Sequence, residues 1–191
     1  MPSIRSKFSD DFVFGAATAA YQIEGSKFGG CGESIWDHFA ENGGTKNGED
    51  GAVACDHFHR FEEDLDLLVD AGFSAYRFSF SWSRLFPDGK NLNIKGLDFY
   101  KQLLDAINSR GLLPFGTAYH WDMPQALGAL GGWTILENAE RFGEYMGFIA
   151  RNFGEDLENL VSINEPWCVA WLSHYLGEHA PGLRDLSCAV K

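Results

Sequence analysis

Residues 94–122 read IKGLDFYKQLLDAINSRGLLPFGTAYHWD, and they contain one complete copy of the pattern that organises the chain. Apolar side chains recur at the spacing of one helix face, at Ile94, Leu97, Leu104 and Ile107. Gly111 then stands where a helix C-terminal cap belongs, and residues 112–119 form a short apolar segment. This stretch therefore predicts a helix, a glycine stop and a strand.

The same pattern occurs once before and once after this stretch. The earlier helix is predicted from the apolar positions Phe58, Phe61, Leu65, Leu68 and Val69, and Gly72 separates it from a strand at 74–80. The later helix is predicted from Phe142, Met146, Ile149 and Phe153, and Gly154 separates it from a strand at 160–163. A further apolar strand is predicted at 12–17, so four strands alternate with three helices.

Such alternation is typical of an α/β fold with parallel strands joined by right-handed crossovers. A doubly wound sheet and a closed barrel both satisfy the pattern. The predicted strands end in polar and aromatic residues: Gln22 and Glu24, then 79–84, 119–122 and 164–167. No glycine-rich phosphate loop follows any of them. Functional groups at successive strand ends are how a (β/α)8 TIM barrel builds its site, so we expect residues 1–191 to form the first four β/α units of one, a half-barrel.

Composition excludes several other classes. The net charge of −12 and the lack of a basic stripe argue against a nucleic-acid partner. Because there is no apolar signal region and no run of 18 apolar residues, we expect no membrane association and a cytoplasmic protein. The four cysteines are widely spaced, which favours free buried thiols. His57 and His59 diverge on a helix, so no metal site is expected there. Residues 43–51 fit either a ligand-binding loop or an ordinary surface loop, and the surface loop is the favoured interpretation.

Glu165 is the candidate for acid–base chemistry. It follows the strand at 160–163 directly and lies between Asn164 and Pro166. Proline ends the strand ladder and disfavours helical geometry at the residue before it, which holds Glu165 at the rim of the barrel. A carboxyl group at that rim is placed for general acid work, although spacing alone fits a solvated loop glutamate equally well.

Several longer motifs resemble family 1 of the glycoside hydrolases, the β-glucosidase family. FGAATAAYQIEG at 14–25 looks like its N-terminal signature, CDHFHRF at 55–61 like its first helix, and YRFSFSWSR at 76–84 like its second strand. YHWDMPQAL at 119–127 and GGW at 131–133 are similar to its third strand and loop. NEP at 164–166 resembles its acid/base motif, and APG at 180–182 the turn beyond it. The resemblance covers essentially the whole chain, in order.

This resemblance implies a retaining β-glycosidase that cleaves terminal β-linked sugars by double displacement without a metal or organic cofactor. Glu165 would be the catalytic acid and base. Asn164 would bind the sugar 2-hydroxyl, while Gln22, His120 and Trp121 would hold the other hydroxyls. Arg77 would keep the nucleophile ionised. Trp133 and Trp167 would either line the aglycone side or serve in packing.

The chain departs from the family pattern in one respect. A retaining glycosidase needs two carboxylates about 5 Å apart. The family's nucleophile lies in a Glu-Asn-Gly segment, and none follows Glu165 here. A TIM barrel typically has about 250 residues, so only the N-terminal half is expected. The chain is then a fragment or split half, a genuine half-barrel, or an inactive truncation.

Two functions remain open for such a chain. In the first it is a β-glucosidase-like enzyme that is nearly inactive without a complementary C-terminal half. In the second it is a non-catalytic sugar-binding or assembly module that keeps Gln22, His120 and Asn164. Because the first and fourth strands would be unpaired edges, we expect association with a complementary half or with itself.

Overall fold

One parallel sheet organises the chain, of which the computed structural model describes residues 4–191. Its strands are β1 (Gly15–Ala17), β2 (Ala75–Ser79), β3 (Leu113–Tyr119) and β4 (Asn159–Ile163), hydrogen-bonded in that order. All three pairs are parallel. The strand order follows the chain without the reversal that marks a doubly wound sheet. The structure therefore confirms the predicted half-barrel, with strand ends shifted by one residue in β2, β3 and β4 and with β1 shortened to three residues.

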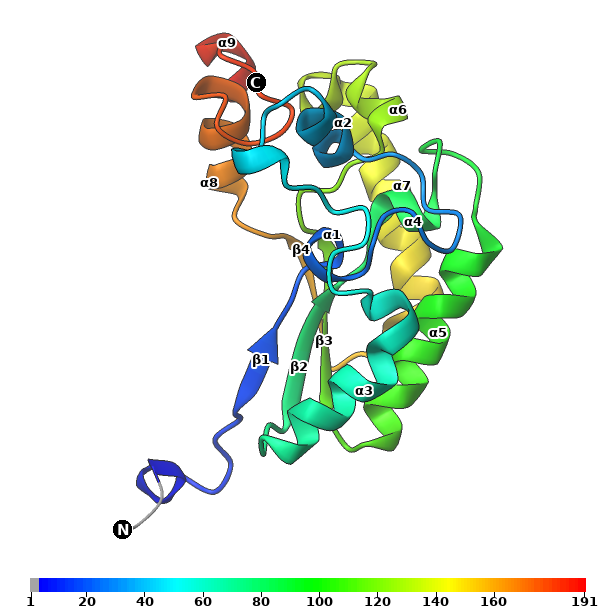
Figure 1. Cartoon of the computed structure of the whole chain (residues 1–191), viewed down its shortest axis with the longest axis vertical. Helices are drawn as coiled ribbons and strands as arrows, with labels where there is room; N and C mark the ends of the chain where they lie inside the picture. The colour runs from blue at the N-terminus through cyan, green and yellow to red at the C-terminus, as the bar shows by residue number, and fades with distance from the viewer. Residues whose placement is uncertain (1–3) are drawn as a thin grey trace.

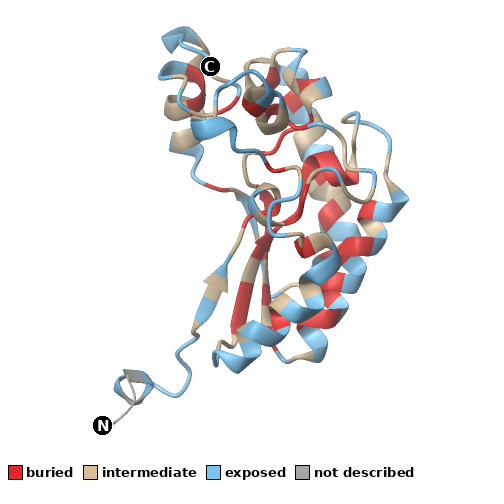
Figure 2. Cartoon of the chain, viewed as in Figure 1, coloured by how far each residue is buried: buried red, intermediate tan, exposed pale blue. Residues whose placement is uncertain are grey.

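Three long helices cover one face of this sheet (Figure 1). They are α3 (His57–Asp70), α5 (Ile94–Ser109) and α7 (Leu136–Phe153). Of their thirteen predicted apolar positions, five are buried and six are partly buried (Figure 2), and these eleven belong to one core cluster with Tyr76 and Phe78 of β2. Two predicted positions at helix ends, Val69 and Ile94, are instead 42% and 59% exposed. The apolar spacing predicted the buried face of each helix correctly, but it does not show where along the helix contact with the sheet ends.

The opposite face of the sheet is not covered by helices within the described chain (Figure 1). Arg77 alternates with Tyr76 and Phe78 and so lies on this open face. Its Nε donates to Thr117 Oγ1 at 2.9 Å. Val161 pairs with Thr117 in register and is 41% exposed. In a closed barrel this face would point toward the interior.

Shorter elements fill the connections. The helical ones are α1 (Ala20–Ile23), α2 (Ile35–Glu41), α4 (Trp82–Leu85), α6 (Gln125–Gly128), α8 (Pro166–Cys168), the π-helix η5 (Val169–Tyr175) and α9 (Leu186–Ala189). Four 3-10 turns complete the list: η1 (Ile4–Lys7), η2 (Lys46–Gly48), η3 (Gly132–Thr134) and η4 (Gly154–Asp156). They are too short for periodicity to predict. Among residues 4–191 no helix combines the length and apolarity that crossing a membrane requires.

A buried ion pair joins the ends of β1 and β2. Arg84 Nε donates to Glu24 Oε2 at 2.7 Å, and the side chains are 1% and 4% exposed. Arg84 also donates to the carbonyl oxygens of Phe28 and Gly25, and the Tyr100 hydroxyl donates to Glu24. Every charged atom thus has a partner, which a buried pair requires. Glu24 and Arg84 hold the fold together, so not every polar residue at a strand end faces a ligand.

Asp122, at the end of β3, is a second buried acid. It is 1% exposed, and neither carboxyl oxygen has a hydrogen-bond partner within residues 4–191. Burial raises the pKa of Asp122 to about 7; the nearby Ser81 hydroxyl opposes the rise, and the charge of Glu24 adds to it. A neutral carboxyl is the form that such an environment tolerates.

The prediction for the cysteines was half right. Cys31, Cys55, Cys168 and Cys188 are free, but none is fully buried and Cys55 is exposed. Cysteine's general preference for interiors was a poor guide here, because all four lie in loops or short helices outside the sheet-and-helix core.

Removing Arg84 tests the role of the ion pair. Arg84→Ala leaves Glu24 buried without a counter-charge, so we expect the free energy of unfolding to fall by about 3–5 kcal/mol. The measurement is urea denaturation of both proteins. Arg60→Ala is the matched control, because the Arg60–Glu63 pair is exposed and its loss should change stability little. Equal effects of the two substitutions would contradict the assignment.

Candidate functional site

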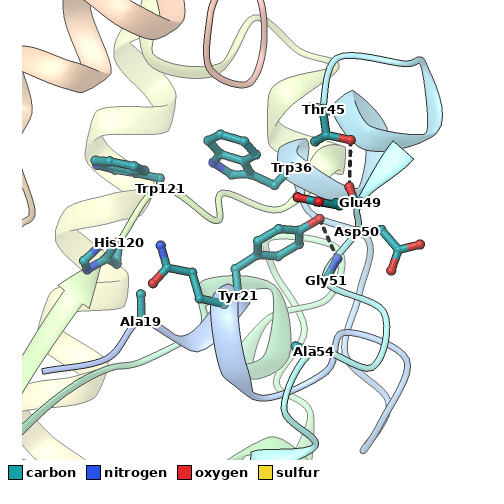
Figure 3. A pocket seen from close by; sticks show the side chains of 11 residues that line it. Ala19, Tyr21, Trp36, Thr45, Glu49, Asp50, Gly51, Ala54, His120 and Trp121 are labelled. Atoms are coloured by element: carbon teal, nitrogen blue, oxygen red, sulfur yellow. Dashed lines mark hydrogen bonds between the residues drawn. The ribbon is translucent and has the colours of Figure 1, made fainter. Parts of the chain in front are cut away.

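A cavity of about 280 Å³ opens at the carboxyl ends of the strands. The predicted residues Gln22, His120 and Trp121 line it, together with Tyr21 and Trp36 (Figure 3). Gln22 and Tyr21 lie on α1, directly after β1, while His120 and Trp121 follow β3. Parallel pairing brings these strand ends to one edge, which is why residues distant in sequence share a cavity.

The loop at 43–51 also forms part of this cavity. Thr45, Glu49, Asp50 and Gly51 line its wall. The Gly51 N–H donates to the Tyr21 hydroxyl at 3.2 Å, and the Thr45 hydroxyl donates to the Glu49 carbonyl oxygen at 2.7 Å (Figure 3). The interpretation of this segment as a surface loop was therefore incomplete, because loop composition carries no sign of what the loop packs against.

Trp36 and Tyr21 are cavity residues that sequence reasoning missed. The sequence did contain a local signal for the helix that carries Trp36. Ser34 and Asp37 form a capping box at the start of α2, and Trp36 lies in the first turn of that helix. Trp36 then stacks on Trp121, with ring centroids 6.4 Å apart and planes 22° apart. His179 contacts both indole rings, with centroid distances of 5.5 and 5.1 Å. The aromatic wall thus joins α2, the end of β3 and the loop after η5.

A chain of hydrogen bonds connects three of the predicted residues. Arg77 Nη2 donates to Asn164 Oδ1 at 2.7 Å, and Asn164 Nδ2 lies 3.2 Å from His120 Nε2. Arg77 comes from β2, His120 follows β3 and Asn164 follows β4. Because Oδ1 accepts from arginine, Nδ2 must be the donor toward the imidazole, and Nε2 must accept. The network therefore requires the neutral tautomer of His120 that carries its proton on Nδ1.

The electrostatic environment supports this neutral form. Burial, the largest cause, and the positive charge of Arg77 together lower the pKa of His120 to about 4, while the negative charge of Glu165 opposes the shift. The Nδ1 atom has no partner within residues 4–191. His120 is therefore positioned as a neutral hydrogen-bonding group with one ring nitrogen unused.

The indole N–H of Trp121, which was expected to hold a sugar hydroxyl, already has a hydrogen-bond partner within the chain. The Trp121 backbone adopts a φ of 80°, a left-handed conformation that costs energy for a bulky residue. Its indole Nε1 donates to the Asn164 carbonyl oxygen at 2.9 Å. Because an indole has a single donor, the ring face is the part left to contact a ligand. The strained backbone places that face in the cavity wall.

Glu165 is the N-cap residue of α8, next to Pro166, and its side chain makes no capping hydrogen bond. Its φ is 47°, again left-handed, and its side chain is exposed. It adjoins Asn164, which is 8% exposed, but it is not among the residues that line the cavity. The structure thus brings together Gln22, His120 and Trp121 in the wall, links Arg77, Asn164 and His120, and places Glu165 beside them, open to solvent.

The two tryptophans left open by the sequence differ. Trp133 packs against Tyr119 and Phe142, with centroid distances of 5.0 and 5.3 Å. Trp167 is 59% exposed beside Glu165 and has no such contacts among the described aromatic pairs. Trp133 also lines a smaller cavity, of about 130 Å³, so both tryptophans keep surface next to open space.

The two histidines in the first turn of α3 have protein partners. His57 Nδ1 lies 2.6 Å from Asp64 Oδ2, and His59 Nδ1 lies 2.6 Å from Asp56 Oδ1. A separate group, Glu33, His38 and Glu41, brings possible ligand atoms within 4.8 Å of one another. All three side chains are exposed, and none lines the cavity.

A comparison with known protein families decides the classification. The profile of glycosyl hydrolase family 1 matches residues 4–190. The chain belongs to this family. β-Glucosidase A of Thermotoga maritima is 47% identical over 188 residues, which are 97% of this chain and 42% of that protein. A β-glucosidase of an Agrobacterium species is 46% identical over 98% of this chain and 42% of its own length.

Solved structures of family 1 enzymes agree with this fold. A family 1 β-glucosidase from Thermotoga maritima superposes with a TM-score of 0.92 at 47% identity, over 95% of this chain and 42% of that one. The same protein has been solved with castanospermine and with deoxynojirimycin. The AHE enzyme of Alicyclobacillus herbarius superposes with a TM-score of 0.93, over 96% and 41%. The chain thus spans about two-fifths of the length of these family 1 relatives.

The protonation state of His120 can be measured directly. Because burial favours the neutral ring, we expect NMR titration to give a pKa near 4, and the ring to stay neutral from pH 5 to 8. Arg77→Gln removes a positive charge and should raise this pKa, whereas Glu165→Gln should lower it. A depressed histidine pKa means that its contribution to stability is present above pH 6.5 and is lost as the pH falls toward 4. Titration near 6.5 in every variant would contradict the network.

Proposed function

We propose that this chain supplies the sugar-binding and acid/base part of a retaining β-glycosidase of the β-glucosidase type. The observation that supports it best is the hydrogen-bonded series Arg77–Asn164–His120 beside Glu165 at the carboxyl ends of the strands. Three strands must be in register for these groups to meet. Membership of family 1, and relatives named as β-glucosidases, support the same assignment.

In the proposed reaction Glu165 acts twice. As an acid it gives its proton to the glycosidic oxygen while the bond from that oxygen to the anomeric carbon breaks. A second carboxylate bonds to the anomeric carbon from the opposite face and forms a glycosyl ester. Glu165, now ionised, then takes a proton from water as the water oxygen displaces the ester. We place the second carboxylate on a complementary segment of the barrel.

The other groups orient the sugar. Asn164 is held by Arg77 and so presents its amide in one orientation, which suits recognition of the 2-hydroxyl. Gln22 and His120 in the cavity wall are the hydroxyl partners, and Trp121 offers its ring face to a pyranose. The exposed Glu165 would be enclosed when the second half of the barrel covers the open face.

The open sheet should drive association. Strands β1 and β4 each have a single neighbour in residues 4–191, and Val161 leaves apolar surface on the open face. We therefore expect the purified 21.2 kDa chain to elute from size-exclusion chromatography as a dimer or larger species. Val161→Lys should shift it toward the monomer. A stable wild-type monomer that melts cooperatively would contradict the expectation.

Catalysis is tested by complementation. The remaining part of Thermotoga maritima β-glucosidase A is co-expressed with this chain, and hydrolysis of 4-nitrophenyl β-D-glucoside is followed. We expect activity with both parts and little with either alone, because one carboxyl group cannot complete the double displacement. Glu165→Gln should reduce the rate by about 100-fold or more, the range of general acid catalysis. Glu158→Gln, at the other end of β4, is the matched control and should be neutral.

The alternative function is a sugar-binding or assembly module without turnover. It is favoured by the cavity, which residues of this chain line without a partner. Saturable binding of castanospermine or deoxynojirimycin to the chain alone, together with a complemented complex that binds them but hydrolyses nothing, would support this reading. Binding lost in Asn164→Ala would show that the same cavity is used.

A further inference from the structure

A second cavity, of about 250 Å³, lies between α7 and the segment formed by α4 and the turn after it. It shares no lining residue with the cavity at the carboxyl ends of the strands. Tyr145, in its wall, donates from its hydroxyl to the carbonyl oxygens of Phe80 and Ala118, at 3.2 and 3.0 Å. These acceptors belong to the central strands of the sheet, β2 and β3, or lie directly after them. The cavity therefore lies on the helix-covered side of the sheet, over β2 and β3 and away from the edge strands β1 and β4.

Positive charge gathers at this cavity. Lys90, Arg141 and Arg151 line it, with Glu144 as its one acid. Within residues 4–191 the three cations form no ion pair and do not lie over an aromatic ring, whereas Arg60, Arg84 and Arg110 all pair with acids. The whole chain carries a net charge of −12. The three cations and one acid that line the cavity give it a net charge of +2, opposite in sign to the net charge of the whole chain.

The arginines are placed by the geometry of α7. Arg141, Glu144, Tyr145, Phe148 and Arg151 recur at helical spacing and so share one face of the helix. The arginine Cα atoms are about 15 Å apart along the axis at 1.5 Å per residue. Arg151 folds back toward the cavity, since a Cβ on Gly147 would lie 3.0 Å from its Nη1. Lys90 faces them from the opposite wall, in a turn closed by Asp88.

Aromatic rings form the floor between these charges. Trp82 and Tyr145 stack at 5.0 Å with planes 11° apart, and both are buried to 2% exposure or less. Phe86 and Phe148 meet edge to face at 5.1 Å and are only partly buried. The buried pair makes the floor rigid, and the outer pair leaves apolar surface for a ligand.

We propose that this cavity binds a small organic anion with a planar apolar body, such as an aryl phosphate, sulfate or carboxylate. Guanidinium groups match the oxygens of such anions in paired hydrogen bonds. The partly exposed Phe86 and Phe148 contact the ring of the ligand. Lys90, on the opposite wall, adds a further positive charge that attracts the anionic group. The negative charge of Glu144 opposes binding of an anion, so removing that charge should strengthen binding. A bounded cavity of this size suits a small molecule better than an acidic protein segment.

The experiment titrates the intact chain with three probes at constant ionic strength, by calorimetry and by NMR of the Gly89 and Gly147 amides. The probes are phenyl phosphate, inorganic phosphate and phenol, which carry the charge and the ring together or singly. We expect one-to-one binding of phenyl phosphate that is about tenfold tighter than that of either other probe. If inorganic phosphate bound as tightly as phenyl phosphate, the ring would contribute nothing to binding, and the proposal that the cavity recognises an aromatic group would be wrong.

Matched variants separate the site from general charge effects. Arg141→Gln and Arg151→Gln should each weaken phenyl phosphate binding by about three- to tenfold, and Glu144→Gln should tighten it. Phe148→Leu should lower the affinity for phenyl phosphate until it is close to the affinity for inorganic phosphate. Lys95→Gln, on α5 outside the cavity, should leave binding unchanged. Thermal melts confirm that each variant is folded.

Three results would overturn the proposal. The first is no saturable signal with phenyl phosphate up to about 10 mM. The second is an equal loss of affinity in Lys95→Gln, which would show only a diffuse charge effect. The third is binding of an acidic peptide by a chain that ignores all three small probes. None of these outcomes depends on glycosidase activity, so failure here leaves the proposed reaction untouched.

Discussion

Parallel pairing of four consecutive strands is the constraint on which the rest of this structure depends. Parallel neighbours share a direction, so every carboxyl end reaches the same edge of the sheet. The 2.7 Å hydrogen bond from Arg77 to Asn164 shows the consequence, because it links residues contributed by β2 and by the end of β4. A slip of one residue in register would turn Arg77 toward the helices and break the series to His120.

Beneath the site lies a second polar layer with a different purpose. Glu24 and Arg84 are buried at the same strand ends as the ligand-facing groups, yet their charges are satisfied by each other, by Tyr100 and by backbone carbonyls. Asp122 lies in the same layer and is accommodated as a carboxyl group whose pKa is raised. Arg84 and Glu24 anchor the segment that follows Gln22, and Asp122 directly follows Trp121. Residues of one motif therefore divide between supporting the site and forming it.

The two cavities differ in electrostatic character. The cavity at the carboxyl ends of the strands is lined by Glu49 and Asp50 and, among residues 4–191, by no lysine or arginine, and this lining is compatible with the neutral ligand proposed for it. The outer cavity carries three cations over an aromatic floor. One is built from strand ends and loops on the open side of the sheet, the other from helix surfaces over its closed side. A half-barrel thus offers two chemically distinct surfaces.

The sequence by itself determined the alternation of elements, the parallel sheet and the likeness to family 1, because helix period, glycine stops and motif order are local properties. It also placed Gln22, His120, Trp121 and Asn164 at strand ends. Only the tertiary structure decided which strand-end residues are buried supports, that the 43–51 loop lines the cavity, that the indole N–H of Trp121 is already bonded, and that Trp36 belongs to the site. Each of these depends on which atoms meet across distant segments, and burial and hydrogen bonding are set by those contacts and not by local pattern.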